Sequence, residues 1–326
     1  MGSEFFDLPT EDQQKSLTTF AVELLKDYGI YGAQVSCINF EFNATFSVET
    51  ESGTKYALRI NINSTRTVEN MKAEVEWVRH LNRTSGVHVP TPIATVKDDY
   101  IVSALHADSG QTLYGVMYSW LEGEELGDEP TSQQLHEVGR TIATLHQESS
   151  EFALSSGNSL PTFNDFFWGT EDFLFSEKSL LSDRDRALIQ QAHDLIMKFT
   201  NELYENSKVH IIHADMHGWN LMWHEGQLSI FDFDDCGYGV EAQDLAVTLY
   251  YLDTPEQDEA LLNGYKSVRP LPTYSANAMK ALLLQRRLLL LNYLFETKNQ
   301  DHQEMLPAYL EKSLERVSTF LTDVRG

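Results

Sequence analysis

The octapeptide HADMHGWN, residues 213–220, is the most informative stretch of this 326-residue sequence. It holds two histidines, an aspartate and an asparagine, and His210 stands just before it. Such residues serve either as ligands of a zinc centre or as the acid and amide of a phosphoryl-transfer loop. The spacing matches no zinc hydrolase pattern of the H-E-x-x-H kind, and a strand would point His210 and His213 to opposite faces. We therefore favour the loop over the metal centre.

Four polar residues in and after this stretch suit a nucleotide site. Asp215 and Asn220 lie five positions apart, too far to share one helix face, so the sequence predicts a loop there. Downstream, QLSIFDFDD (227–235) predicts a strand, and if it stays extended Asp232 and Asp234 point the same way. Carboxylate and amide oxygens are ligands that Mg²⁺ accepts, and a further carboxylate can receive a hydroxyl proton. The four residues together predict a site for Mg²⁺ and a nucleotide.

The first third of the chain shows the pattern of a small antiparallel sheet with one main helix. In NFEFNATFSVE (39–49) apolar and polar residues alternate, which is typical of a strand with one buried face. The turn ESGT (51–54) leads into KYALRINI, so the two runs predict a hairpin. Apolar spacing and turn residues predict the other elements: helices over about 11–27 and 68–82, and strands over 99–105 and 112–121.

Glu74 falls inside the apolar stripe of the helix predicted over 68–82. A buried carboxylate needs a partner, and Arg59 on the preceding strand is the nearest basic residue in the sequence. The alternative is that Glu74 lies at the edge of the stripe and reaches solvent. We expect the ion pair.

Helical spacing dominates after residue 126, beginning with Leu135, Val138, Ile142 and Leu145. The chain therefore predicts an α+β, two-lobed architecture, with a small antiparallel β lobe and a large, mostly α-helical lobe. Residues 1–118 are predicted to form an N-terminal nucleotide-binding lobe, and residues 119–127 a hinge. Residues 128–326 are predicted to form a C-terminal lobe with the catalytic loop and the acceptor site.

The order H-x-D-x-x-x-x-N, hydrophobic strand, D-F-D resembles the catalytic and metal-binding segments of the protein-kinase-like fold. HADMHGWN, IFDFDDCGYG and DLA, in that order, are similar to the aminoglycoside phosphotransferase and choline kinase family. The resemblance covers nearly the whole chain. It implies that Asp215 is the catalytic base, that Asn220 and Asp232 bind Mg²⁺, and that Asp234 is a candidate further ligand.

The same resemblance assigns the nucleotide site of the small lobe. ALRI stands where protein kinases have V-A-I-K, which implies that Arg59 contacts the ATP phosphates and is held by Glu74. Backbone groups of Ser119, Trp120 and Leu121 would form the hinge that meets the adenine.

Two features depart from the kinase pattern. Arg59 replaces the phosphate-contacting lysine, so a planar guanidinium with several donors takes the place of a compact ammonium group. No G-x-G-x-x-G or P-loop frame occurs, so the turn in FEFNATF (40–46) would have to cover the phosphates with its own backbone.

Bracing roles and turn-capping roles are alternatives for some of these residues. The resemblance implies that His213 and Asp244 brace the loops. Asp244 could instead cap a helix that starts at Leu245, and Asp232 and Asp234 could cap a turn. The joint placement of these acids with the 213–220 loop favours the functional interpretation.

The formal net charge is −25, from 24 Lys and Arg against 49 Asp and Glu. Such a charge disfavours nucleic acid or an anionic membrane as partner, and a cationic or neutral small molecule fits better. Two distant cysteines, and no basic and apolar start of a signal peptide, predict a cytoplasmic location. The apolar run 281–295 is interrupted by Gln285, Arg286 and Arg287, so it predicts a buried helix and not a membrane span.

The expected activity is ATP- and Mg²⁺-dependent transfer of the γ-phosphate to a hydroxyl of an aminoglycoside-, choline- or homoserine-like molecule. Acids and aromatic residues alternate in PTFNDFFWGTEDFLF (161–175), which suits an amine-bearing acceptor, although the aromatic residues could simply pack helices together. A protein Ser/Thr kinase and a nucleotide-binding pseudoenzyme are the alternatives.

Overall fold

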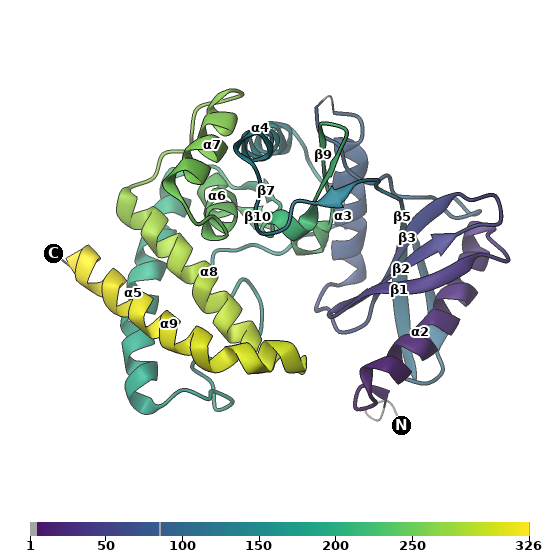
Figure 1. Cartoon of the computed structure of the whole chain (residues 1–326), viewed down its shortest axis with the longest axis horizontal. Coiled ribbons are helices and arrows are strands. Elements are labelled where there is room, and N and C mark those ends of the chain that lie inside the picture. The colour runs from purple at the N-terminus through teal and green to yellow at the C-terminus, as the bar shows by residue number, and fades with distance from the viewer. Residues whose placement is uncertain (1–4, 85, 326) are drawn as a thin grey trace. The chain divides into compact units, whose positions relative to one another are not determined.

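The computed structural model describes residues 5–84 and 86–325 and divides into two compact units. The first unit comprises Met1–Glu124, Leu154–Ser159 and Met222–Asp234. The second comprises Glu125–Ala153, Leu160–Leu221 and Asp235–Gly326. Residues 1–4 and 326, at the ends of the predicted lobes, lie outside the described part. Figure 1 colours the chain by residue number, so that the strands between residues 34 and 119 are purple to blue and the last helix is yellow.

The first unit is built on a five-stranded antiparallel sheet of order β1-β2-β3-β5-β4. Helix α2 (Thr10–Leu24) packs on this sheet, and its buried Leu17, Phe20 and Leu24 join the buried side chains of the strands in one core. The strands are β1 Gln34–Phe40, β2 Asn43–Glu49, β3 Lys55–Asn61, β4 Ile101–His106 and β5 Gln111–Ser119. The predicted hairpin around the 51–54 turn is confirmed, because β2 and β3 pair in register from Asn43↔Asn61 to Glu49↔Lys55.

The single strand predicted over 39–49 is wrong. The segment contains the end of β1, a turn at Glu41 and Phe42, and the whole of β2. The alternation holds only within β2, where Ala44, Phe46 and Val48 are fully buried, whereas Phe42 is exposed. Phe40 and Phe42 continue the period-2 spacing in the sequence, so the spacing of apolar residues did not reveal the turn between β1 and β2.

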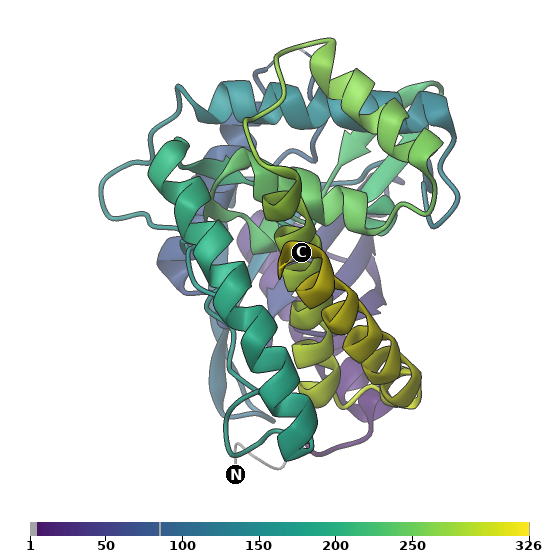
Figure 2. The ribbon, with the colours of Figure 1, turned by 90° about the vertical axis from the view of Figure 1, so that its left-hand side faces the viewer.

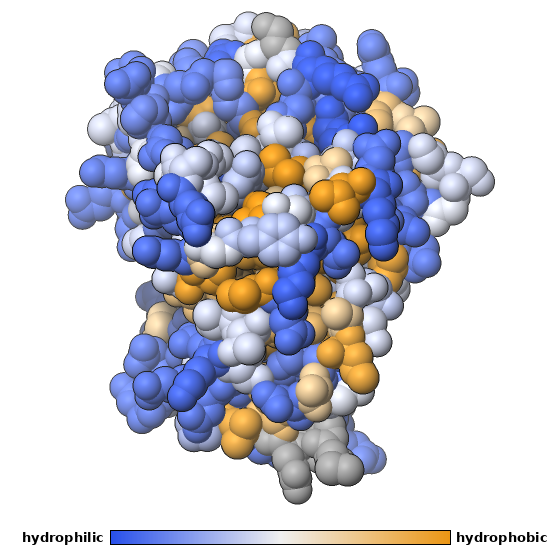
Figure 3. Space-filling model, turned by 90° about the vertical axis from the view of Figure 1, so that its right-hand side faces the viewer, coloured by the Kyte–Doolittle hydropathy of each residue, from blue (hydrophilic) through white to orange (hydrophobic). Residues whose placement is uncertain are grey.

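Helix α3 (Val68–Leu81) starts at a capping box in which Thr67 and Asn70 bond to each other's backbone N–H groups. Its predicted apolar stripe is buried, and Glu74 is buried with it. The segment Met222–Asp234 adds most of β8 (Leu221–His224) and all of β9 (Gln227–Ile230) to the first unit, and β8 lies between β9 and the short β6 (Glu124–Glu125). On the face shown in Figure 3, hydrophobic residues form separate areas among hydrophilic ones.

Helices make up most of the second unit. In Figure 2, α5, α8 and α9 run as long helices that pack against one another. Helices α4 and α7 approach each other closely at Gly139 and Gly264, where a Cβ atom would lie 1.9 Å from the carbonyl oxygens of Leu261 and His136. The helices are α4 Ser132–Ser149, α5 Asp183–Asn206, α6 Glu241–Tyr250, α7 Pro255–Lys266, α8 Ala276–Glu296 and α9 Gln300–Arg325.

Helix α8 contains the apolar run that was predicted to be buried. Leu284, Leu288 and Leu291 lie in the core shared with α5 and α9, and Gln285 is fully buried. Every helix within residues 5–84 and 86–325 is too short or too polar to span a bilayer.

Candidate active site

The loop that contains Asp215 leaves strand β7 (His210–Ile212), which pairs antiparallel with β10 (Gly237–Gly239). Ala214 has a φ of 66°, a left-handed conformation that costs energy in any residue with a Cβ atom. Asp244 on α6 offsets this cost, since its carboxylate accepts the Ala214 N–H at 2.8 Å and the His213 N–H at 3.2 Å. The sequence-based prediction that Asp244 braces the loop is therefore confirmed.

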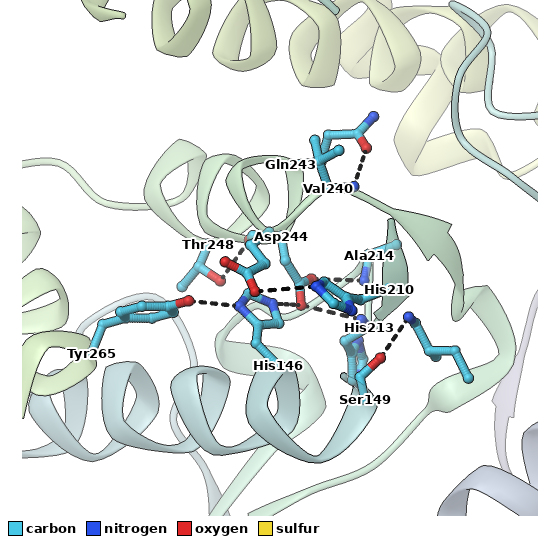
Figure 4. A network of polar contacts seen from close by, with 12 residues as sticks. His146, Ser149, His210, His213, Ala214, Val240, Gln243, Asp244, Thr248 and Tyr265 are labelled. Atoms are coloured by element: carbon cyan, nitrogen blue, oxygen red, sulfur yellow. Dashed lines mark hydrogen bonds and ion pairs between the residues drawn. The ribbon is translucent and has the colours of Figure 1, made fainter. Parts of the chain in front are cut away.

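Asp244 belongs to a fully buried polar network (Figure 4). Its Oδ2 lies 3.0 Å from His146 Nε2, and His146 Nδ1 lies 3.0 Å from the hydroxyl of Tyr265. Burial alone would raise the pKa of Asp244, but its bonds to His146 and Ala214 hold that pKa below its ordinary value. Helices α4, α6 and α7 thus fix the backbone immediately before Asp215.

Three donors surround the carboxylate of Asp215. Arg286 forms an ion pair and hydrogen bond with Oδ1. Asn220 Nδ2 donates to Oδ2 at 3.0 Å and to the Asp215 carbonyl at 2.9 Å, and His217 Nε2 lies 3.3 Å from Oδ2. Burial would raise the pKa of Asp215, but Arg286, followed by His217, holds it well below the ordinary value. The carboxylate is therefore ionised and fixed in orientation.

His217 orients both the loop and Asp215. Its Nδ1 accepts the backbone N–H of Trp219 at 3.3 Å at the start of the short 3₁₀ turn Gly218–Asn220. A ring whose Nδ1 accepts carries its proton on Nε2, and that atom faces Asp215. The histidines of the zinc alternative face different acids, since His210 Nε2 lies 3.6 Å from the carboxylate of Glu241 and His217 Nε2 lies 3.3 Å from that of Asp215.

Arg286 was not predicted as a site residue. It lies on α8, and its Nη2 also donates to the hydroxyl of Tyr251 at 2.8 Å. The sequence did contain a signal, namely a positive charge inside a run of leucines, because a buried guanidinium requires an acid nearby. Nothing in the spacing identified Asp215 as that acid, since 71 positions separate the two residues.

The predicted pair of Arg59 and Glu74 is confirmed in the first unit. The two side chains form a buried ion pair and hydrogen bond, and the hydroxyl of Tyr118 donates to the other Glu74 oxygen at 2.7 Å. Glu74 does not reach solvent, because it is 3% exposed. Burial would lower the pKa of Arg59, but Glu74 and then Asp234 raise it well above its ordinary value. Arg59 therefore remains a cation whose position is set by helix α3.

Asp232 and Asp234 lie near the same guanidinium, although not through the predicted geometry. The prediction that 227–235 stays extended is wrong, because β9 ends at Ile230, Asp232 has a φ of 59°, and Phe233–Asp235 forms a 3₁₀ turn. Even so, their Oδ1 atoms lie 3.8 Å and 3.6 Å from Arg59. A turn, not a shared strand face, therefore brings the two carboxylates near Arg59, and their role as metal ligands stays a prediction.

Asn43 approaches the same group of side chains from the start of β2. Its Nδ2 donates to Asp234 Oδ2 at 2.8 Å, whereas its own buried Oδ1 has no hydrogen-bond partner in the described part of the chain. Two carboxylates and an unpaired amide oxygen are the kind of donor set that a hard cation accepts. These oxygen atoms are of the chemical type that Mg²⁺ accepts, and binding of Mg²⁺ by Asp232 and Asp234 stays a prediction.

At the end of β5, backbone and side chain of Ser119 are engaged with the preceding loop. The Ser119 N–H donates to the Thr91 carbonyl and its Oγ accepts the Thr91 N–H, each at 2.8 Å. Lys55 Nζ lies 6.0 Å from the ring centroid of Trp120. The contact of Ser119, Trp120 and Leu121 with adenine stays a prediction.

Two of the three acids of 161–175 bond to backbone within the segment, and Glu171 is exposed and ion-paired with Lys178. Asp165 accepts the N–H groups of Phe167 and Gly169, and Asp172 accepts those of Leu174 and Phe175. Phe166 and Leu174 belong to the core formed with α5, α8 and α9. The packing alternative is therefore confirmed for these apolar residues, whereas Asp165 and Glu171 are exposed.

Comparison with known proteins now identifies the family. The model of the Phosphotransferase enzyme family matches residues 41–276, a span that holds Arg59, Glu74, the 213–220 loop and Asp232. The chain belongs to this family. It is an ATP-dependent phosphotransferase that acts on a hydroxyl group of a small molecule, and the predicted two-lobed kinase-like fold is confirmed.

Individual relatives agree with the family assignment. The chain is similar to amicoumacin kinase of Bacillus subtilis, with 26% identity over 78% of this chain and 79% of the relative. It is similar to hydroxylysine kinase of Bos taurus, with 25% identity over 74% and 70%. Its fold is similar to that of a microcompartment-associated aminopropanol kinase, with a TM-score of 0.79 and 24% identity over 94% and 98%.

Proposed function

We propose that Asp215 orients the acceptor hydroxyl and receives its proton in this phosphotransferase. The observation that carries the proposal is the carboxylate itself, which is held by Arg286, His217 and Asn220. The hydroxyl oxygen attacks the γ-phosphorus, a new O–P bond forms, and the bond between the γ-phosphorus and the ADP oxygen breaks. Such transfer needs little covalent help from the protein, and depends on positioning and on charge stabilisation.

The low pKa of Asp215 suits this role. A strongly ionised carboxylate is a weak base, so it accepts a hydrogen bond from the hydroxyl throughout and takes the proton only as the new O–P bond makes the hydroxyl acidic. The donors around it fix the direction in which its lone pairs point. The main role of Asp215 is thus to orient the hydroxyl in line with the γ-phosphate, and removal of the hydroxyl proton before attack is its minor role.

The nucleotide end of the reaction is proposed to use the first unit. Arg59, held by Glu74, would contact the ATP phosphates, and Ser119, Trp120 and Leu121 would present backbone groups to the adenine. A guanidinium already fixed by a buried acid loses little side-chain freedom on binding a phosphate. The chain therefore has a charged group for ATP in spite of its large negative charge.

The metal ligands are proposed to be Asp232, Asp234 and Asn220. Asn220 donates to Asp215 through Nδ2, so its amide oxygen is the atom left to act as a ligand. Within the described residues, no group of three or more His, Cys, Asp or Glu side chains could hold a metal ion. Mg²⁺ is commonly bound by one or two carboxylates together with nucleotide phosphates and water, and when bound it neutralises phosphate charge.

The acceptor is proposed to be an alcohol that also carries an amine. The names of two relatives, hydroxylysine kinase and aminopropanol kinase, refer to molecules with both groups. The net charge of −25 attracts a cation over a long range. A protein substrate is less well supported, because α6 begins at Glu241, directly after β10 ends at Gly239, and leaves little chain for a peptide-binding loop.

A coupled assay of ADP release over amino alcohols, hydroxy amino acids and amino sugars tests the proposal. We expect one class to stimulate Mg²⁺-dependent ADP release, and Asp215→Asn to lower kcat by about 10²–10⁴-fold, the usual contribution of a positioned acid or base. ATP should still raise the melting temperature of Asp215→Asn, because the nucleotide contacts are intact. Phosphate transferred to a protein and to no small alcohol would contradict the proposal.

A further inference from the structure

A pocket in the second unit lies beside the catalytic loop. Asp128, Val138, His217, Trp219, Thr248 and Tyr251 are among the residues that line it. Two of the lining residues, His217 and Tyr251, also contact Asp215 or its partner Arg286. His217 Nε2 lies 3.3 Å from Asp215 Oδ2, and the Tyr251 hydroxyl accepts a hydrogen bond from Arg286, the partner of Asp215. A molecule in this pocket would therefore be one side chain away from Asp215.

Backbone contacts hold the pocket in shape. The N–H of Leu126 donates to the Leu221 carbonyl at 3.0 Å, and the N–H of Gly127 donates to the Gly218 carbonyl at 3.1 Å. A Cβ atom on Gly218 would lie 1.9 Å from the Gly127 carbonyl oxygen, so only glycine permits this approach. Asp128 is thereby fixed against the catalytic loop.

The rim of the pocket combines an exposed aromatic ring with an exposed acid. Trp219 is 51% exposed, which is unusual for the largest side chain, and its Nε1 donates to Asp128 Oδ1 at 3.0 Å. This bond fixes the indole by its edge and leaves its π face as a surface for contact. Indole faces and carboxylates are the two groups that recognise an ammonium ion, and here they are joined.

The charges around Asp215 also decide where an ammonium group can go. Asp215 is already paired with the Arg286 guanidinium, so a second cation at that carboxylate would be repelled. Asp128 is exposed and hydrogen-bonded to the neutral indole, and no cationic side chain of residues 5–84 and 86–325 forms an ion pair with it. Neighbouring Glu125 and Glu129 are also exposed and add to the negative potential.

We propose that the pocket at Trp219 and Asp128 binds the ammonium group of the acceptor while the acceptor hydroxyl meets Asp215. The inference rests on the proposed function, which supplies the amine-bearing alcohol, and adds the site that selects it. Trp219 contacts the cation through its π face, and Asp128 forms the ion pair. Since His217 and Tyr251 separate the pocket from Asp215, they set the distance between amine and hydroxyl that the enzyme accepts.

Paired acceptors test the inference. The assay compares kcat/KM for aminopropanol and for butanol, in which a methyl group replaces the ammonium group, in the wild type, Asp128→Asn and Trp219→Leu. We expect the wild type to prefer aminopropanol, and each substitution to reduce that preference by roughly threefold to tenfold, mainly through KM. Glu129→Gln is the control, because it removes the same charge from the adjacent position and should change the preference less.

Two further outcomes separate the inference from the proposed function. If neither alcohol nor any amino sugar stimulates ADP release, the proposed function fails, and binding of aminopropanol is then followed by calorimetry. Binding to the wild type that is weakened in Asp128→Asn would still support the pocket. An equal loss of kcat/KM for both alcohols in Asp128→Asn and Trp219→Leu would overturn the inference. In the calorimetry, equal affinity of the wild type and Asp128→Asn for aminopropanol, or no binding to the wild type, would also overturn it.

Discussion

Arg286, in the middle of helix α8, is ion-paired with Asp215 in the catalytic loop. The side chains of Arg286 and Asp215 are only 11% and 20% exposed, so their attraction is weakly screened. The pair lowers the pKa of Asp215 in the folded protein below its unfolded value of about 3.9. Its contribution to stability is therefore fully present above that pH and is lost as the pH falls through the folded-state pKa.

Replacing Arg286 with methionine should raise the pKa of Asp215, because burial then acts with less opposition. We expect the free energy of unfolding at pH 7 to fall by about 3 kcal/mol, as for other broken buried pairs. The acid limb of the kcat/KM profile should move to higher pH. Urea denaturation and a pH–rate profile measure the two effects.

Arg287→Met provides the matched control. Arg287 is next to Arg286 on α8, but it contacts the Ser313 and Tyr250 hydroxyls and the Tyr309 ring and no carboxylate that the structure records. This variant should lose packing and keep the wild-type pH profile. An acid limb that moves equally in both variants would show that Arg286 does not set the pKa of Asp215.

The sequence predicted most of what local pattern and residue chemistry can determine. Glu74 is predictable as a buried acid because it falls inside an apolar stripe, and Arg59 as its partner because it is the nearest basic residue on the preceding strand, 15 positions earlier. Arg286 was missed as a partner, since only tertiary folding brings helix α8 to the 213–220 loop. Asp232 was placed on a strand because a left-handed φ leaves no mark in the spacing of apolar residues.

Glu74→Gln tests whether helix α3 positions Arg59 for the nucleotide. Glutamine keeps the shape but removes the charge, so the buried guanidinium loses its main partner and is drawn toward Asp232 and Asp234. We expect the KM for ATP to rise by roughly tenfold, in line with the loss of a buried charged hydrogen bond. Glu76→Gln is the control on the same helix, because Glu76 bonds to Ser155 and Asn158 and not to Arg59. An equal rise in both variants would refute the positioning role.

His146→Phe tests the network under the catalytic loop. It removes the side-chain donor to Asp244 and leaves that buried carboxylate with the backbone N–H groups of His213 and Ala214. We expect a loss of about 1–3 kcal/mol in the free energy of unfolding. Because the backbone before Asp215 is then held less firmly, kcat should fall more than the KM for ATP changes. In His146→Gln the amide can donate to Asp244, so this variant should recover part of the free energy of unfolding and part of kcat. Equal stability and equal kcat in His146→Phe and His146→Gln would argue against a role for the hydrogen bond.

Asp232→Asn tests the proposed metal ligands. The change replaces a carboxylate with a neutral amide of the same size near Arg59, so the fold should persist while the attraction for Mg²⁺ weakens. We expect the Mg²⁺ concentration for half-maximal activity to rise by about 10–100-fold, and ATP with Mg²⁺ to stabilise the variant less than the wild type in a thermal melt. Asp235→Asn is the control, because it removes the same charge three residues along the chain. A Mg²⁺ requirement that changes equally in both variants would attribute the effect to net charge and not to ligation by Asp232.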